Sequence, residues 1–425
     1  MAELSIIVTT YNIENYVADC LDSIISQSFE DIEIIVVDDG SSDGTVDIIN
    51  GYAERDSRIV FVPLTENTIG GVATAANVGL DRATAPLVGF ADGDDLYEPT
   101  MFERLVVAIE SSDADLAMCK YALLDDVSGE RSEPADARRW DALGSSAVDL
   151  TDDDARIEIL RFIAVPWRKL YRRELLDRHD IRFPVGDYFW EDNPFHWFTV
   201  CAAERLALVP EVLCAHRINR AGQTMQSGDA RLVKMFDHHD SILAFLEAAE
   251  LRGRFDRELL LWSISQLEWI SRSLPAEYRS LLLDRFAEVL GVYTPADVER
   301  AFEASTKGQR ARDLVAAARS RDADAFDAAI DGAPSPTSTP TATTTRLVGR
   351  FGHHLQNGGP SQALAVTRRY VSLRASGAKK RVLGKRGTKK TVTNDDLMFS
   401  MLLLERRLED LEQRIIDLGT PGGRE

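Results

Sequence analysis

Three hydrophobic segments of this chain each end in a cluster of acids or hydroxyls. They are Leu4–Asn12 (LSIIVTTYN), Ile32–Gly44 (IEIIVVDDGSSDG) and Phe90–Asp95 (FADGDD). Short runs rich in β-branched residues predict buried strands, and the carboxyl ends of parallel strands meet at one edge of an open α/β sheet, where such folds bind ligands. The sequence therefore predicts an α/β fold whose functional site lies at that edge.

Strand and helix signals alternate over the first half of the chain with short links, as a mostly parallel sheet requires. The segment 124–154 is acidic and weakly patterned, which favours an excursion from the sheet or a lid. The segment 166–176 (PWRKLYRRELL) predicts a helix, and 181–184 (IRFP) is strand-like. We predict strands at 4–10, 32–38, 59–64, 87–91 and 115–121, and helices at 16–27, 44–54, 70–83 and 99–111.

The second half divides by composition into four parts that follow a first domain at 1–228. Residues 229–332 have helical periodicity throughout and predict a helical module, and 333–345 (APSPTSTPTATTT) is a Pro/Thr-rich linker. A basic segment covers 346–393. In 394–419, apolar residues recur alternately four and three positions apart, which predicts an amphipathic coiled-coil helix. We expect this helix to make the chain a homo-oligomer, with dimer and trimer both open.

Charge is distributed unevenly along the chain. The net charge is −20, yet residues 346–390 contain twelve Lys or Arg and no acid, which leaves −32 on the rest. An acidic body of this kind argues against a general nucleic-acid binder. The basic segment could attract an anionic membrane or another polyanion, or it could be a solvated linker that contacts the acidic body. Both interpretations stay open.

Cysteines and the N-terminal residues indicate the compartment. The four cysteines are scattered without the spacing of metal ligands, so we expect buried free thiols. The first residues lack the charged start, apolar core and cleavage site of a signal peptide, and 4–10 is too short to span a membrane. We expect a cytoplasmic protein, with the basic segment able to bring it to the inner face of the plasma membrane.

The FADGDD motif has the pattern of a divalent-cation site. Asp92 and Asp94 are two residues apart, so in strand geometry they project to the same side. Paired carboxylates favour Mg²⁺ or Mn²⁺, which proteins hold through one or two carboxylates together with substrate phosphates. An acidic turn after a strand is also common without any metal, and the order of the other motifs favours the metal site.

The DDGSSDG motif suits recognition of a uridine nucleotide. Uracil presents an N3–H donor where cytosine has an acceptor, so a carboxylate such as Asp39 selects uridine. Ser42 and Asp43 also fit a simple turn and helix cap. Farther on, Gly70 and Gly71 could bring backbone amides near a phosphate or sugar, although two glycines are more often only a turn.

Taken in order, the motifs resemble those of the family 2 glycosyltransferases, whose nucleotide-sugar domain has the Rossmann-like GT-A fold. The resemblance covers residues 4–224, about half of the chain, and rests on the ordered set IIVTTYN, SIISQSF, IEIIVVDDGSSDGT, NTIGGVATAANVGL, VGFADGDDLYEP, WRKLYRRELL and WEDNPF. Similar architectures with C-terminal helical additions serve bacterial cell-wall, capsule and teichoic-acid synthesis. The resemblance implies an inverting, Mn²⁺- or Mg²⁺-dependent hexosyltransferase that moves a sugar from a UDP-sugar to a cell-wall, capsular or teichoic-type polymer or a lipid-linked glycan.

The same resemblance implies a role for individual residues. Asp192 becomes the catalytic base with Glu191 beside it, because transfer to an alcohol needs a group that accepts the hydroxyl proton. Asp192 also fits the N-cap of a helix, and both roles can hold together. The metal ligands are Asp94, Asp92 and His216, with Asp95 in support. The contacts with the nucleotide-sugar are Thr9, Tyr11, Asp38, Asp39, Asn67, Gly70, Asn77, Asp92, Gly93, Arg217 and Arg220.

One position departs from the pattern of the family. Relatives often have an arginine before the asparagine of the fourth motif, whereas Ala76 precedes Asn77 in this chain. The diphosphate charge must then be met by the metal or by Arg217 and Arg220. His216 stands at a strand end, where a lone histidine is more often structural than a ligand.

Aromatic and basic residues near Asp192 admit two interpretations. Trp167, Tyr188, Trp190 and Trp197 could line an acceptor groove through stacking on sugar rings, although core packing suits most of them better. The WRKLYRREL helix is expected to shape the acceptor side, where its basic residues could meet an anionic acceptor.

Two other functions compete with sugar transfer. A nucleotidyltransferase would place a phosphate loop rich in glycine and lysine after the first strand, where this chain has TTYNIENY. A catalytically silent sugar-binding or scaffolding subunit would not need a base, so the Glu191–Asp192 pair argues against it.

Overall fold

The computed structural model describes residues 2–143, 147–220 and 229–332. The chain divides into two compact units, 1–331 and 332–425, and all elements named below belong to the first. The predicted linker at 333–345, the basic segment at 346–393 and the oligomerisation helix at 394–419 lie outside the described residues. Oligomer formation and membrane contact therefore stay predictions.

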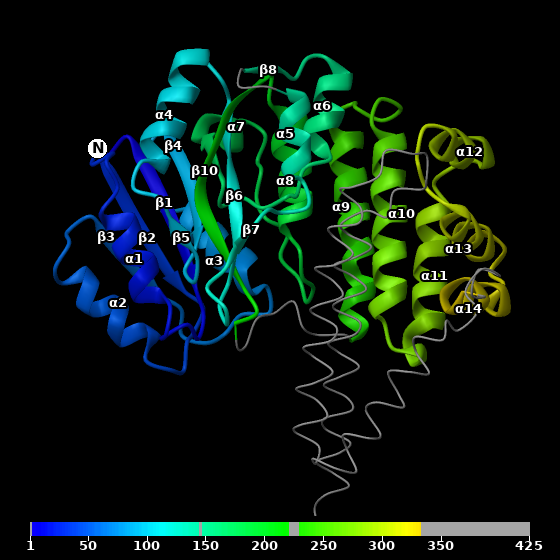
Figure 1. The fold of residues 1–425 in the computed structure, drawn as a ribbon, viewed down its shortest axis with the longest axis horizontal. Coiled ribbons are helices and arrows are strands. Elements are labelled where there is room, and N and C mark those ends of the chain that lie inside the picture. Colours follow the sequence, from blue (N-terminus) through cyan, green and yellow to red (C-terminus); the bar gives the residue numbers. More distant parts are fainter. Residues whose placement is uncertain (1, 144–146, 221–228, 333–425) are drawn as a thin grey trace, which may run out of the picture. The chain divides into compact units, whose positions relative to one another are not determined.

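Within the described residues, ten strands form one sheet (Figure 1). Its main order is β3-β2-β1-β4-β9-β6-β10-β5, while β7 pairs with β6 and β8 with β10. The first four strands are mutually parallel, and β9 runs antiparallel between β4 and β6. The strands are β1 (Leu4–Thr10), β2 (Ile32–Asp38), β3 (Ile59–Pro63), β4 (Leu87–Asp92), β5 (Leu96–Tyr97), β6 (Leu116–Asp125), β7 (Arg131–Ser132), β8 (Val148–Asp149), β9 (Lys169–Arg172) and β10 (Arg205–Ile218). The predicted α/β class is confirmed, and the five predicted strands correspond to β1, β2, β3, β4 and β6.

Helices cover both faces of the sheet, because each has an apolar face at helical spacing. On α1, for example, Val17, Cys20, Leu21 and Ile24 are buried. One face carries α1 (Val17–Ile25), α2 (Thr45–Ala53) and α4 (Met101–Ser112). The other carries α3 (Gly71–Leu80), α5 (Trp140–Leu143), α6 (Asp153–Leu160), α7 (Arg173–Arg178) and α8 (Asp192–Ala202). The four predicted cysteine thiols are free and buried.

The predicted helical stretch after residue 229 is helical in the structure and shares a core with the sheet. Ile242, Leu246 and Leu259 pack in the same apolar cluster as strand residues, while a second cluster is internal to the helices. The helices are α9 (Met235–Ala248), α10 (Asp256–Ser273), α11 (Arg279–Leu290), α12 (Pro295–Glu303), α13 (Gln309–Ser320) and α14 (Ala323–Asp331), with a short 3₁₀ turn at Ala230–Lys234. The division at 228/229 stays a prediction.

The prediction for 166–176 was wrong in its first half. Lys169–Arg172 form the central strand β9, and the helix begins only at Arg173. Arg168 and Lys169 are fully buried and so cannot meet an acceptor from solvent. Pairing with β4 on one side and β6 on the other decides this conformation, and the local pattern of charges does not reveal it.

Two further segments differ from their predictions. The strand-like segment 181–184 is irregular. The segment 124–154 contributes buried Trp140 and Leu150 to the core, so this part of it packs on the sheet. Among the described helices, none has the length and apolar character needed to cross a bilayer.

Candidate active site

Strands β1, β2 and β4 end at the same edge of the sheet. The register pairs Thr10 with Asp38 on one side of β1 and Thr9 with Asp92 on the other. The predicted residues at these three strand ends are therefore brought together. Tyr11, just beyond β1, is 46% exposed, so part of this residue is accessible to a ligand.

Asp38 and Asp39 are both buried at the end of β2, and hydrogen bonds fix each of them. The Asp38 carboxylate accepts from the Thr10 hydroxyl at 2.9 Å and from the Ser41 amide at 2.8 Å. The Asp39 carboxylate accepts from Asn67 Nδ2 at 2.9 Å and from the Thr68 hydroxyl at 2.8 Å. Burial raises the pKa of Asp39, and the Thr68 hydrogen bonds oppose this.

Glycine at position 40 is required by this turn. Its φ is +74°, and a Cβ would lie 2.4 Å from the backbone carbonyl carbon of Glu66. A side chain would therefore push the Asn67 loop away from Asp39.

Asp92 stands where β4 breaks into the FADGDD turn. The Tyr97 hydroxyl accepts from the Asp92 amide at 2.8 Å and lies 3.3 Å from its carbonyl oxygen, which anchors the backbone of the turn. At Gly93, a Cβ would meet Ile13 Cδ1 and Thr10 Cγ2, each at 2.7 Å. The turn therefore packs tightly on the end of β1 and holds the acids at the edge.

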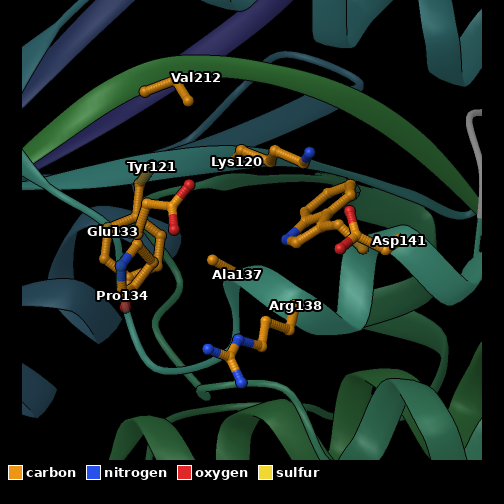
Figure 2. A pocket seen from close by; sticks show the side chains of 9 residues that line it. Lys120, Tyr121, Glu133, Pro134, Ala137, Arg138, Asp141 and Val212 are labelled. Carbon is orange, nitrogen blue, oxygen red and sulfur yellow. The ribbon is translucent and has the colours of Figure 1, made fainter. Parts of the chain in front are cut away.

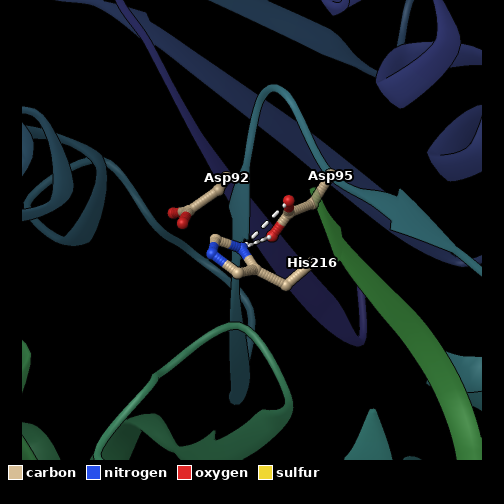
Figure 3. Close-up of side chains that lie close together, drawn as sticks. All are labelled: Asp92, Asp95 and His216. Carbon is tan, nitrogen blue, oxygen red and sulfur yellow. Dashed lines mark hydrogen bonds and ion pairs between the residues drawn. The ribbon is translucent and has the colours of Figure 1, made fainter. Parts of the chain in front are cut away.

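Asp92, Asp95 and His216 gather at this edge (Figure 3). One potential ligand atom from each lies within 4.8 Å of the other two. His216, on β10, has Nδ1 2.9 Å from an Asp95 carboxylate oxygen, and its ring stacks on Trp167 at 5.1 Å between centroids. Carboxylate oxygens and an imidazole nitrogen suit Mn²⁺ and, less closely, Mg²⁺.

Burial and, after it, like charge disfavour the ionised forms of the acids in this cluster. Burial raises the pKa of Asp92 well above its usual range, and the neighbouring Asp95 and Asp94 add to the shift. Burial disfavours the charged form of His216, but the Asp95 carboxylate outweighs it and raises the pKa of His216 to about 9. A divalent cation would relieve the repulsion between these carboxylates.

The sequence placed the metal on Asp94, Asp92 and His216, and the structure arranges these residues differently. Asp92 and His216 lie together with Asp95. The Asp94 carboxylate is paired with the Arg220 guanidinium instead. Arg217 donates from Nε to the Asp94 carbonyl oxygen at 3.0 Å, so both predicted arginines reach the acidic turn.

Tyr16, directly before α1, contacts both arginines. Its ring lies under the Arg217 guanidinium at 5.0 Å and under that of Arg220 at 5.8 Å. Its hydroxyl donates to Asp126 at 2.9 Å, and Asp126 also accepts from Arg217 Nη1 at 3.0 Å. These contacts hold two cations beside the proposed position of the diphosphate.

Asp192 is the first residue of α8, and Glu191 directly precedes that helix. Asp192 is close enough to Asp92 to contribute to the raised pKa of that carboxyl. Burial raises the pKa of Asp192 itself, and the protonated form of Lys169 opposes this, although burial also lowers the pKa of Lys169 well below its usual range. Burial raises the pKa of Glu191 to about 7, while the Ala73 backbone at the start of α3 partly opposes the rise.

Lys169 and His196 form a buried pair behind Asp192 that the sequence did not reveal. Lys169 Nζ donates to the Val165 carbonyl oxygen at 2.9 Å and lies 3.3 Å from His196 Nδ1. His196 is four residues after Asp192, so both lie on one face of α8. A lysine in a KLY motif gives no sign of full burial, and His196 had no motif context.

Two residues predicted to contact the nucleotide-sugar instead contact the loop before Glu191. The Asn77 amide donates to the Phe183 carbonyl oxygen at 2.8 Å and accepts from the Phe183 amide at 2.9 Å. Gly70 abuts Val185, whose Cγ1 would be 2.6 Å from an added Cβ. Both residues thus fasten α3 to the loop that leads to Glu191.

A separate hollow of about 120 Å³ lies between β6, β10 and the segment 133–141 (Figure 2). Its wall shares no residue with the acidic cluster or with Glu191 and Asp192. It is lined by Lys120, Tyr121, Glu133, Pro134, Ala137, Arg138, Trp140, Asp141 and Val212.

The parallel half-sheet, with an acidic turn after β4 and carboxylates at the start of α8, has the arrangement expected of the GT-A fold. The sequence model of the family "Glycosyl transferase family 2" matches residues 5–180. This region is therefore a family 2 glycosyltransferase domain, and the resemblance seen in the motifs is confirmed.

Individual relatives agree with this assignment. The uncharacterized glycosyltransferase EpsJ of Bacillus subtilis is 35% identical over 51% of this chain. The poly(ribitol-phosphate) β-N-acetylglucosaminyltransferase TarS of Staphylococcus aureus is 29% identical over 53% of it. The match spans 61% of EpsJ and 37% of TarS. A substantial part of each relative therefore has no counterpart in this match.

A solved structure shares the fold over a longer stretch. The crystal structure of Staphylococcus aureus TarS 1-349 in complex with UDP-GlcNAc superimposes with a TM-score of 0.63 at 23% identity. The superposition covers 78% of this chain and 91% of the other.

Proposed function

We propose that this protein is an inverting, divalent-metal-dependent glycosyltransferase that uses a UDP-sugar. The observation that carries the proposal is a cluster of acids at one sheet edge with a further carboxylate within electrostatic range of it. Asp92 and Asp95 stand with His216 at the strand ends, and Asp192, at the start of α8, is near enough to contribute to the raised pKa of Asp92. The cluster at the strand ends suits a divalent metal bound to the diphosphate, and Asp192 suits the role of acceptor for the hydroxyl proton.

The strand ends would bind the nucleotide. Exposed Tyr11 offers a ring on which uracil can stack, and the Asp39 carboxylate, held by Asn67 and Thr68, is the acceptor suited to the uracil N3–H. Arg217 and Arg220 would shift part of their hydrogen bonding from the acidic turn to the diphosphate.

The fit of the metal rests on the clustered donors. Asp92, Asp95 and His216 would hold Mn²⁺ or Mg²⁺, and Asp94 would join them where Arg220 releases it. When bound, the cation neutralises charge that develops on the departing diphosphate. Deprotonation of His216 would accompany its use as a ligand, since its pKa lies near 9.

Asp192 would act on the acceptor. As the acceptor oxygen forms its bond to the anomeric carbon, the hydroxyl proton passes to the Asp192 carboxylate, and the bond to the diphosphate oxygen breaks so that UDP leaves with the electron pair. A single displacement of this kind inverts the anomeric configuration. The raised pKa of Asp192 makes it a stronger base than an ordinary aspartate.

The proposed acceptor is based on the relatives of this domain. Relatives include a poly(ribitol-phosphate) transferase, which favours a repetitive cell-wall, capsular or teichoic-type polymer over a lipid-linked glycan. Homo-oligomerisation through 394–419 would raise the effective concentration of active sites on such a polymer. A silent scaffolding subunit would have no use for a base such as Asp192, and a nucleotidyltransferase would place a phosphate loop rich in glycine and lysine after β1.

The test is release of UDP from a panel of UDP-sugars, with water or poly(ribitol phosphate) as acceptor, in Mn²⁺, in Mg²⁺ and in chelator. The proposal expects metal-dependent release and an inverted anomer in the product by NMR. Retention of configuration, or equal release in chelator, would overturn it.

A further inference from the structure

The segment that carries Asp192 is held by the helical part of the chain, downstream of the matched family region. Lys234 Nζ pairs with Asp187 at 2.7 Å, and His238 on α9 has Nε2 2.7 Å from the Phe189 carbonyl oxygen. On α10, the Trp269 ring packs edge-on against Trp190 at 5.1 Å. Three contacts thus fasten the residues just before α8.

The backbone needs this support, because Trp190 has a φ of +66°. A bulky residue in the left-handed region costs about 1–3 kcal/mol and persists where surrounding contacts enforce it. The turn at Trp190 aims the chain so that Glu191 and Asp192 begin α8 at the sheet edge.

A chain of hydrogen bonds continues from α10 to the carboxylate itself. Trp262 Nε1 donates to Asn193 Oδ1 at 3.3 Å. Asn193 Nδ2 donates in turn to Asp192 Oδ1 at 3.0 Å and to the Trp190 carbonyl oxygen at 3.1 Å. The indole N–H can only donate, so it fixes the amide with its oxygen towards Trp262 and its NH₂ towards Asp192.

We propose that Trp262 is a positioning residue for Asp192, which it orients through the Asn193 amide, and that the helical part thereby completes the active site. This inference rests on the proposed role of Asp192 as base. Trp262 itself touches no substrate. Its action is to keep a donor on one carboxylate oxygen, which leaves the other oxygen to take the acceptor proton.

The charged and titratable groups around Asp192 set the sign of the expected change. Lys169 on β9 favours the ionised carboxylate, whereas Glu191 beside it and Asp92 on β4 disfavour it. Tyr121 on β6 and Tyr171 on β9 also lie within its electrostatic range and stay neutral. Loss of the Asn193 donor would remove a hydrogen bond to the ionised Asp192 carboxylate, so the pKa of Asp192 would rise.

The experiment compares Trp262→Phe with Trp269→Phe in the full-length protein. Both replacements remove an indole N–H from half-buried rings two turns apart on α10, but only Trp262 belongs to the hydrogen-bond chain. UDP release by water is measured against pH with Mn²⁺ and the UDP-sugar that binds best, and calorimetry gives the donor Kd.

We expect Trp262→Phe to lower kcat about fivefold near neutral pH, the effect of one neutral hydrogen bond. The pH at which kcat begins to rise should be higher than in the wild type, and the donor Kd should stay within twofold of the wild-type value. Trp269→Phe keeps an aromatic ring against Trp190 and leaves the hydrogen-bond chain intact, so it should match the wild type in both. In an Asn193→Ala background, Trp262→Phe should add no further loss, because the connection is already broken.

Two results would overturn the inference. One is equal profiles for Trp262→Phe and Trp269→Phe, and the other is a full additional loss in the Asn193→Ala background. If Trp262→Phe does not fold, an unchanged profile for Asn193→Ala overturns it alone. Failure of the proposed function would look different: Asp192→Asn would keep its activity, or no UDP-sugar would bind the wild type.

Discussion

The two sides of the candidate site are built in different ways. The donor side consists of neighbouring strand ends, where Asp39 directly follows β2, Asp92 is the last residue of β4 and turn glycines fix their geometry. The base side is assembled from distant parts of the chain. Asp192 depends on Lys169 of β9 and on Asn193, which Trp262 of α10 orients. One side is therefore local in sequence, and the other depends on tertiary packing.

This contrast predicts that changes on the donor side abolish binding, whereas changes on the base side spare it. Asp92→Asn should have the largest effect, a loss of UDP release of at least about 1000-fold, or roughly 4 kcal/mol of transition-state stabilisation. Metal-dependent donor binding should disappear with it in a calorimetric titration. Asp56→Asn, at a surface pair with Arg58, serves as the control and should behave as the wild type.

Asp192→Asn tests the other side directly. Removal of a general base costs about 10²–10⁴-fold in turnover, so UDP release should fall by about that factor. The donor Kd should remain within twofold of the wild type. A parallel loss of donor affinity would show that the two sides are not separable.

Lys169→Met sharpens the comparison, because it changes the base side without touching the carboxylate. The protonated form of Lys169 opposes the rise in the pKa of Asp192, so its loss should raise that pKa further; burial lowers the pKa of Lys169 well below its usual range, which limits the size of the effect. At neutral pH fewer molecules then carry an ionised base, and turnover should fall about tenfold and recover at higher pH. Lys120→Met on the neighbouring β6 is the matched control. A loss of equal size at every pH would point to general damage instead.

Glu191→Gln should have the smallest effect, and it concerns stability. The folded pKa of about 7 lies above the ordinary value of 4.5, so the wild type loses stability as pH rises from about 4.5 through 7. Because part of the side chain is exposed, we expect the variant to gain about 1–2 kcal/mol at pH 8 and nothing at pH 4. Urea unfolding at the two pH values measures this, and an equal gain at both would contradict the pKa shift.

The same contrast explains what the sequence could and could not predict. Strands β1, β2 and β4 and the helices between them follow from local periodicity, and so do the acids at their ends. Lys169 was interpreted as part of an exposed helix, because the four residues of β9 carry no strand period that distinguishes them. Only pairing with β4 and β6 makes them a central strand.

The partners of individual side chains also could not be predicted from the sequence. Asp94 and Asp95 are adjacent, and nothing in FADGDD tells which of them faces His216 and which pairs with Arg220. Trp262 lies 69 residues from its partner Asn193 and outside every quoted motif. Such contacts depend on how α8 and α10 pack, which no local pattern encodes.

Calorimetry of UDP-sugar binding to the wild type, Asp92→Asn and Asp192→Asn, with Mn²⁺ and with chelator, tests the division of the site most directly. We predict metal-dependent binding that Asp192→Asn retains and Asp92→Asn loses. Binding by all three proteins that is indifferent to the metal, or its loss in both variants alike, would contradict a metal donor site on the strand ends opposite a separate base on α8.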